Sequence, residues 1–199
     1  MLTERANKYL SSLHRRPALP AKLVEQSLFE QGAPCFDSWL VFQEFYAGYI
    51  EPIGSGDFAI WGIVHESPHW LDPLRAQIDR EVREPVWYAT CADVHPSYVY
   101  RLDQAGAFYA PPATSFDVKV EQNALIWEFF QSGKARRAQS KELRDPQFLA
   151  NLRQELASMR DLQLVIEASD DNTRFYASKT RLLREDARLG SIREAWRRA

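Results

Sequence analysis

The residues His65, Glu66 and His69 match the pattern His-Glu-x-x-His, which is the signature of zinc peptidases. That chemistry needs both histidines on one face of a helix, with the glutamate placed as general base. Two features oppose a helix here: residues 58–64 form an apolar run typical of a buried strand, and Pro68 lies between the histidines. A proline inside a helix removes a backbone hydrogen bond and costs about 3 kcal/mol or more. We therefore expect a strand end and a loop, and keep a zinc-dependent hydrolase as the alternative function.

A second set of reactive residue types, Cys91, Asp93 and His95, alternates along the chain. In an extended chain all three side chains lie on one side, and a cysteine nucleophile beside a histidine base is a catalytic arrangement. Neighbours two apart on one strand do not usually converge tightly enough for this, and Pro96 is expected to turn the chain away. We therefore expect packing and turn hydrogen bonds rather than catalysis.

A basic cluster, Lys134-Ala-Arg-Arg137, has the residue types that contact phosphates. Its polar surroundings favour a solvated linker instead. The sequence contains no Gly-rich phosphate loop and no serine nucleophile elbow. We therefore expect no catalytic activity and no cofactor.

The composition is that of an ordinary globular protein, with 45% hydrophobic and 26% charged residues among 199. This length suits one domain, or one domain with an extension. Cys35 and Cys91 lack metal-ligand spacing, and such low cysteine usage suits a reducing cytosol. The N-terminus lacks the apolar segment of a signal peptide, and the apolar run over 58–64 is far shorter than a membrane span. We expect a cytoplasmic protein with no membrane contact.

The net charge of −2 hides an uneven distribution. Residues 1–130 hold 17 acidic and 10 basic residues, a balance of −7, whereas residues 131–199 hold 10 acidic and 15 basic residues, a balance of +5. Residues 25–128 hold 16 acidic and 5 basic residues, a balance of −11. Such asymmetry concerns partners rather than fold, and the acidic part would repel phosphates. We therefore expect no direct binding of nucleic acid.

The elements that must position these residues are clearest between residues 86 and 131. Short aromatic strands alternate there with turn residues, and Gly106 is available for a positive φ in the turn that Asp103 begins. The connections are too short for helical crossovers, so the strands are expected to pair in antiparallel fashion. The predicted elements are strands over 86–91, 98–102 and 108–109 and a helix over 116–131 capped by Ser115.

Caps and apolar spacing predict the remaining elements. Pro20 suits a first helical position, and Gly32 a helix stop. Before residue 86 we predict four helices and one strand. The helices are a first one capped by Thr3, one over 21–31, one within 36–50 and one from Pro73 to Val82, and the strand covers 58–64. After Gly133 we predict a helix carrying Phe148, Leu149, Leu152 and Leu156, strands over 162–166 and 175–176, and a final helix through Leu182, Leu183, Leu189, Ile192 and Trp196.

Three of these segments match one known family. The first segment, Leu19 to Gly32, is a Leu-Pro helix that ends in glycine. The second, Tyr98 to Tyr109, contains a strand, an Asp-x-x-Gly turn and an aromatic strand. The third is the helix that Ser115-Phe116 begins. Together they resemble the SUKH superfamily, the Smi/Knr-like domains of bacterial immunity proteins. The resemblance covers roughly residues 17–131. The chain differs from the family in lacking a clear Asn-Gly pair after the second helix and in carrying a long tail.

These patterns together predict an α+β fold with a central, mostly antiparallel sheet flanked by helices. A C-terminal helix-strand-helix extension is expected to complete it. The expected domains are a SUKH-like domain over 1–131 and an extension over 132–199 that packs on it.

The resemblance implies a non-catalytic immunity protein that binds and occludes a cognate bacterial toxin, a nuclease or another polymorphic toxin, in competition between bacteria. A nuclease cleft must be positive to hold phosphates, so an acidic face with aromatic anchors suits such a partner. The candidate partner-binding residues are the acids Asp37, Glu44, Glu51, Asp57, Glu66, Asp93 and Asp103 and the aromatic anchors Trp39, Tyr46, Tyr49 and Trp70.

Overall fold

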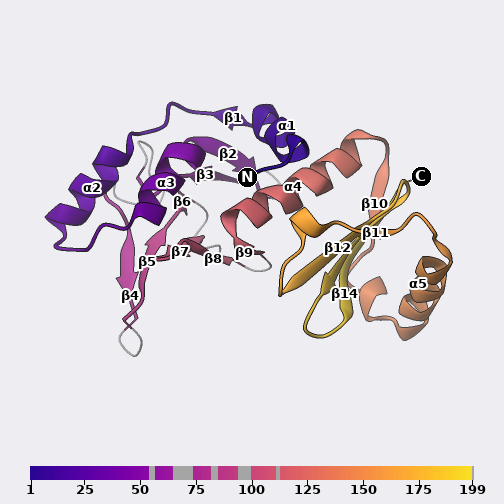
Figure 1. Cartoon of the computed structure of the whole chain (residues 1–199). Coiled ribbons are helices and arrows are strands. Elements are labelled where there is room, and N and C mark those ends of the chain that lie inside the picture. The colour runs from indigo at the N-terminus through magenta and orange to yellow at the C-terminus, as the bar shows by residue number, and fades with distance from the viewer. Residues whose placement is uncertain (54–56, 65–73, 82–84, 94–99, 111–112, 199) are drawn as a thin grey trace. The chain divides into compact units, whose positions relative to one another are not determined.

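The computed structural model describes residues 1–53, 57–64, 74–81, 85–93, 100–110 and 113–198. The chain forms two compact units, a central unit of residues 10–111 and a terminal unit of residues 1–9 and 112–199 (Figure 1). Both contain helices together with antiparallel strands, so the predicted α+β class is confirmed. The division falls at residue 111, so helix α4 (Phe116–Gln131) groups with the tail rather than with the domain predicted over 1–131.

In its described residues, the central unit combines two full helices with strands of two antiparallel sheets. The helices are α2 (Ala21–Glu30) and α3 (Asp37–Tyr46). One sheet has the order β1-β2-β3-β6, from β1 (His14–Arg15), β2 (Tyr49–Pro52), β3 (Phe58–Trp61) and β6 (Ala92–Asp93). The other contains the run β4-β5-β7-β8, from β4 (Ile78–Arg80), β5 (Trp87–Thr90), β7 (Arg101–Asp103) and β8 (Ala107–Ala110).

The meander β5-β7-β8 has a buried row across it. Ala89 pairs with Leu102, and Leu102 pairs with Phe108. All three are buried, and because side chains alternate along a strand, their neighbours in sequence point to the opposite face. The turn between β7 and β8 is the predicted one, with Gly106 at φ +86° and its amide donating to the Asp103 carbonyl.

Gly48 sets the junction between α3 and β2. Its φ is +87°, and a Cβ there would lie 2.3 Å from the carbonyl oxygen of Arg16. A side chain therefore cannot be accommodated without moving the backbone. This explains why the aromatic stretch predicted as helix within 36–50 divides, with the helix ending at Tyr46 and Tyr49 beginning a strand.

The terminal unit is a five-stranded antiparallel sheet with a helix on each face. Its order is β10-β14-β13-β12-β11. The strands are β10 (Ala135–Arg137), β11 (Gln163–Leu164), β12 (Thr173–Ala177), β13 (Arg181–Asp186) and β14 (Ser191–Arg198), besides β9 (Ala113–Ser115) before α4. The helical elements of the tail are η1 (Glu142–Arg144), α5 (Pro146–Ser158) and η2 (Ile166–Ala168).

Each face of this sheet has its own core. On the α4 face, Leu125 and Phe129 pack with Phe175, Leu182 and Trp196. On the α5 face the core groups Leu152 with Leu183 and Ala195, together with the half-buried residues Phe148, Leu156 and Tyr176. Adjacent Leu182 and Leu183 are therefore both buried, on opposite faces.

Two interactions fix the helices at the start of the terminal unit. Ser115 caps α4 as predicted, its Oγ accepting a hydrogen bond from the Val118 amide at 3.2 Å. Glu121, nearly buried on α4, accepts from the amide and the hydroxyl of Thr3 at 2.7 Å each. Thr3 Oγ1 also accepts from the Ala6 amide, which confirms it at the start of α1 (Glu4–Ser12).

Two predicted helices are wrong. The segment from Pro73 to Val82 contains strand β4, and the proline lies outside the described residues. The final helix through Leu182 and Trp196 is a hairpin of β13 and β14, so the tail is not helix-strand-helix. None of the helices in the described ranges has both the length and the apolar character needed to cross a bilayer.

Candidate protein-binding surface

The predicted partner-binding residues fall into separate groups in the structure. Exposed acids are Asp37, Glu44 and Asp57. Residues engaged in contacts inside the central unit are Trp39, Tyr46, Tyr49, Glu51 and Asp103. Glu66 and Trp70 lie outside the described residues, and Asp93 is described by its backbone alone.

Trp39 and Glu51 serve the core. Trp39 is fully buried, and its Nε1 donates to the backbone oxygen of Asp103 at 2.8 Å. Glu51 is 5% exposed and accepts a hydrogen bond from Trp61 Nε1 at 2.9 Å. Buried polar groups need such partners, and neither side chain presents a surface to another protein.

The two tyrosines predicted as anchors also face inward. Tyr46 is buried, with its ring edge-on to Trp61 at 6.2 Å. Tyr49 is half-buried, and the guanidinium of Arg15 lies 4.4 Å from its ring centroid. The same guanidinium donates to the carbonyls of Phe45 and Ala47 at 3.3 and 3.1 Å, so Arg15 satisfies the C-terminal end of α3.

Asp103 shapes a turn. Its Oδ1 accepts from the amides of Ala105 and Ala107 at 2.8 Å each, as an Asx turn requires. The hydroxyl of Ser38 on α3 donates to the carbonyl of Gln104 in the same turn at 3.0 Å. The carboxylate therefore fixes the loop beside the N-terminus of α3.

Three exposed apolar side chains on α2 and α3 were not predicted as anchors. Phe29 is 85% exposed, Val41 51% and Phe45 66%. Val41 and Phe45 are four residues apart, so they share a face of α3. Phe29 follows the buried Leu28, and one step along a helix turns the side chain by about 100°. Exposed apolar side chains that group together are typical of protein-binding sites, so we take these three as candidate anchors.

Acidic side chains flank these three apolar ones. Glu25 precedes Phe29 by one helical turn, Asp37 precedes Val41 by one turn, and Glu44 is next to Phe45. All three acids are exposed, and none forms an ion pair with a cation in the part of the chain that the structure describes. We call the set Glu25, Phe29, Asp37, Val41, Glu44 and Phe45 the α2–α3 surface.

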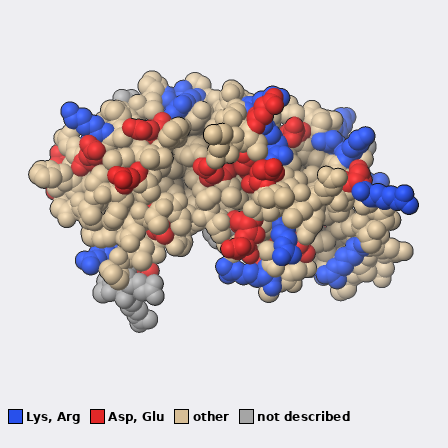
Figure 2. Space-filling model, viewed as in Figure 1, with Lys and Arg blue, Asp and Glu red and all other residues tan. Residues whose placement is uncertain are grey.

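The thiol of Cys35 links the acids of the two helices. Its pKa is raised by partial burial and then by the negative charges of Glu25 and Asp37. Two carboxylates from different helices thus act on one group. Figure 2 shows acidic side chains scattered among uncharged ones in the region of α2 and α3, with basic side chains also present there.

A buried amide holds α3 in place beneath this surface. Gln43 is fully buried; its Oε1 accepts from the Ile63 amide at 2.8 Å, and its Nε2 donates to the carbonyls of Leu19 and Val64 at 2.9 and 3.2 Å. The Gln43 side chain therefore provides hydrogen-bond partners for backbone groups in two segments, the one before α2 and the one after β3. A surface on so fixed a helix is preorganised for binding.

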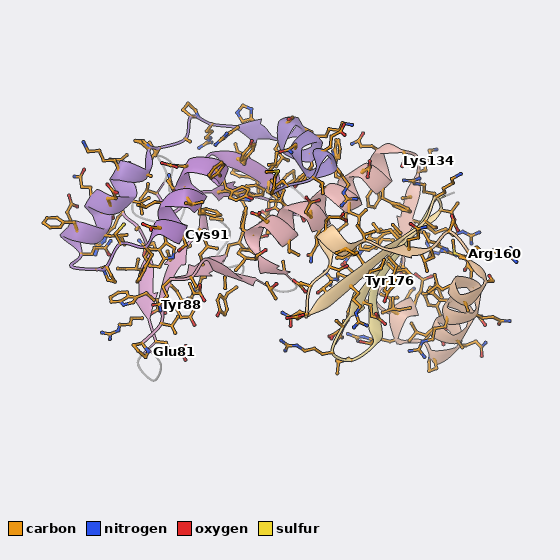
Figure 3. All side chains as sticks on the ribbon, viewed as in Figure 1. Glu81, Tyr88, Cys91, Lys134, Arg160 and Tyr176 are labelled. Carbon is orange, nitrogen blue, oxygen red and sulfur yellow. The ribbon has the colours of Figure 1, made fainter. Side chains whose placement is uncertain are left out.

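A second aromatic cluster lies on the meander face opposite the buried row. Tyr88 and Tyr109 stack edge to face at 5.2 Å (Tyr88 and nearby Glu81 are labelled in Figure 3). Partial burial, and then the charges of Glu81 and Asp103 respectively, raise the pKa of both phenols. The Tyr109 hydroxyl lies 3.4 Å from Asp103 Oδ2, so this cluster is already engaged internally.

The catalytic candidates gain no support from the described residues. His65, Glu66, His69 and His95 lie outside them. Cys91 is fully buried, so a substrate cannot reach it. No group of three or more potential metal ligands occurs among the described residues.

Arg136 and Arg137, from the basic cluster, belong to strand β10 rather than to a solvated linker. They form ion pairs with Glu142 and Glu194 respectively. The expectation of a linker is therefore wrong for residues 135–137, whereas Lys134 lies just before the strand.

Comparison of the chain with protein-family models, curated proteins and solved structures finds no match. The resemblance to the SUKH superfamily stays a prediction.

Proposed function

We propose that this chain is a non-catalytic immunity protein that binds a cognate bacterial toxin through the α2–α3 surface and occludes its active cleft. The class comes from the SUKH resemblance of residues 17–131. The observation that carries the binding site is the exposure of Phe29, Val41 and Phe45 beside acids that have no described ion-pair partner. The toxin is a nuclease or another enzyme with a basic cleft.

The physical argument has an electrostatic part and an apolar part. Acids without ion-pair partners project a negative field, which raises the association rate with a basic partner by about 10 to 10³-fold. Phenylalanine side chains then lose water in the interface and supply most of the affinity, as aromatic anchors do within a polar rim. A cleft filled in this way cannot admit its phosphate-bearing substrate.

The test is a binding measurement against the toxin encoded beside this gene, by surface plasmon resonance at several salt concentrations. We expect Phe45→Ala to weaken binding by about 2 kcal/mol, roughly 30-fold in Kd, mainly through the dissociation rate. The double variant Asp37→Asn, Glu44→Gln should lower the association rate and its dependence on salt.

Matched controls are available in the terminal unit. Leu189→Ala removes an apolar side chain that is 69% exposed, and Asp171→Asn with Glu167→Gln removes two exposed acids. Neither should change binding. The proposal fails if the neighbouring toxin does not bind, or if these controls weaken binding as much as the substitutions on α2 and α3 do.

A further inference from the structure

The terminal unit has a pocket of about 540 Å³ on the α5 face of its sheet. Its walls come from β10, β13 and β14 on one side and from α5 on the other. The side chains of Phe148 and Leu152 and the small residues Ala138 and Ala195 give it an apolar part. A pocket of this size suits a ligand as large as a nucleotide, because small-molecule sites span about 300 to 1,000 Å³.

Three arginines lie side by side across three strands at this pocket. Arg197 on β14 pairs in register with Arg136 on β10 and with Arg181 on β13. Residues directly opposite one another project to the same face, with Cβ atoms about 4.5–5.5 Å apart. All three line the pocket, together with Lys134 before β10. We call Arg136, Arg181 and Arg197 the arginine row.

Acidic neighbours neutralise part of this charge. Arg181 donates to Glu155 on α5 from its Nε at 3.0 Å and from a second nitrogen, and this contact lowers the pKa of Glu155. Arg136 pairs with Glu142 at 2.6 Å. Neither Lys134 nor Arg197 forms an ion pair with any described residue, although the charge of Arg197 also lowers the pKa of Glu155. The four cations Lys134, Arg136, Arg181 and Arg197 therefore face two carboxylates, those of Glu142 and Glu155, and leave an excess of positive charge at the pocket.

Like charges placed opposite each other on adjacent strands destabilise a sheet. The arginine row holds three positive charges against the two carboxylates of Glu142 and Glu155, so a further anion bound there would reduce the remaining repulsion. Planar guanidinium groups match the oxygens of a phosphate in a bidentate manner. The apolar part of the pocket, with the Asn151 amide near it, can hold an uncharged planar body.

We propose that this pocket binds a nucleotide-sized phosphate ester, with its phosphates on the arginine row and Lys134 and its base over Phe148 and Leu152. This site is separate from the α2–α3 surface and does not rest on the proposed function. The ligand adds two to three negative charges, which neutralise Lys134 and Arg197 as they bind.

The test is calorimetric titration of the full chain with ADP and with pyrophosphate at low salt. We expect both to bind, and ADP more tightly because the apolar part of the pocket contributes to its affinity. Arg197→Gln should weaken ADP binding about 10-fold or more, as expected for the loss of a charge-assisted hydrogen bond. Asn151→Glu, which adds a negative charge beside the pocket on an exposed helical position, should weaken it without altering any arginine.

The matched control is Arg160→Gln. Arg160 is exposed just beyond α5 and does not line the pocket; Figure 3 labels it and Lys134. Its loss removes the same charge and should change ADP affinity less than about twofold, since exposed charges at a distance are screened. Circular dichroism checks that each variant is folded.

Three results would overturn the proposal. One is the absence of ADP and pyrophosphate binding at millimolar concentration. Another is an equal effect of Arg160→Gln and Arg197→Gln, which would indicate diffuse attraction. The third is binding of a single-stranded 12-mer oligonucleotide but not of ADP, which would make the basic strands a nucleic-acid surface instead.

Discussion

The two units of this protein use charge in different ways. The central unit holds 13 acidic and 7 basic residues, and the terminal unit 14 acidic and 18 basic residues. In the terminal unit most described ion pairs join neighbouring elements, such as Arg184 to Glu194 at 2.8 Å and Arg193 to Asp186 at 2.8 Å. In the central unit the described residues include one ion pair, Arg101 with Asp79 at 3.7 Å.

This difference separates charges with a structural role from charges available to partners. A carboxylate held by an arginine in the same sheet contributes little field at a distance, because the two charges cancel. The acids of the α2–α3 surface form no ion pair with a described cation, and neither Lys134 nor Arg197 in the terminal unit forms one with a described acid. The net charge of each segment distinguishes an acidic unit from a basic one, but it does not show which charged residues lack an ion-pair partner.

The largest effect is expected from the core beneath the α2–α3 surface. Trp39→Ala should lower the free energy of unfolding by about 3–5 kcal/mol, because it opens a cavity and leaves the Asp103 carbonyl without its donor. Phe45→Ala on the same helix should change it by about 0.5 kcal/mol or less. Urea unfolding followed by circular dichroism measures both. Equal losses in the two variants would contradict the assignment of core and surface on α3.

The next effect concerns the terminal unit. Glu121→Ala should cost about 2–3 kcal/mol, since it leaves Thr3 without its acceptor and Arg5 without its partner at 3.2 Å. Faster amide exchange across α1 would locate the loss. Asp171→Ala, an exposed acid of the same unit, is the control and should leave exchange in α1 unchanged.

Secondary structure with a local cause was predictable from the sequence. Helix α4 runs from Phe116 to Gln131 as predicted, because the Ser115 cap and the apolar spacing agree. Helix α2 was predicted from Pro20 and Gly32 in the same way, and Gly32 has φ +63°. These signals depend on residues within one turn of the helix end, so no tertiary information is needed.

Elements that depend on tertiary burial were not predictable. The segment from Leu182 to Trp196 has helical spacing, yet it forms two strands of a sheet covered on both faces. Both Leu182 and Leu183 are buried there, so the alternation that marks a half-exposed strand is lost. Leu189, which completed the helical pattern, is exposed in the turn before Gly190, whose φ is +58°.

Of the α2–α3 surface, the sequence analysis named the acids Asp37 and Glu44 but not Glu25 or the three exposed apolar side chains. Asp37 and Glu44 are exposed as expected, whereas Trp39 and Tyr46 face the core. Composition places aromatic residues on a helix but does not orient them. The signal for Phe29 was its position next to Leu28: with Val24 and Leu28 as the core face, Phe29 must point elsewhere.

Acid should affect the two units unequally. A hydrogen bond from the Gln139 amide and then one from Arg136 lower the pKa of Glu142. Hydrogen bonds from Arg181 and Arg193 lower the pKa values of Glu155 and Asp186 respectively, and all three acids lie in the terminal unit. A lowered folded-state pKa gives stability that is complete above the unfolded pKa and is lost as the pH falls through the folded value. We expect urea midpoints reported by β13 and β14 to fall as the pH decreases below about 4.5, with a smaller change for α2 and α3.

A pair of variants isolates the cause of this acid sensitivity. Asp186→Asn removes the titrating group that accepts from Arg193 at 2.8 Å and should flatten the decline. Asp171→Asn removes an exposed acid and should not. If both variants keep the full decline, the ion pairs of this sheet do not cause it.

The smallest effect has the opposite sign. Arg197→Gln should raise the free energy of unfolding by about 0.2–1 kcal/mol in the absence of ligand, because it removes a positive charge between Arg136 and Arg181. Arg197→Lys keeps the charge and should not show the gain, and added salt should reduce the difference between the two variants. Urea unfolding at low and high salt measures it.

Arg197→Gln would then both stabilise the free protein and weaken ADP binding. This combination would indicate that Arg197 serves ligand binding rather than the fold, since binding sites commonly carry such costs in stability. A loss of stability in Arg197→Gln would instead show that Arg197 acts as a structural partner of Glu155, whose pKa it helps to lower.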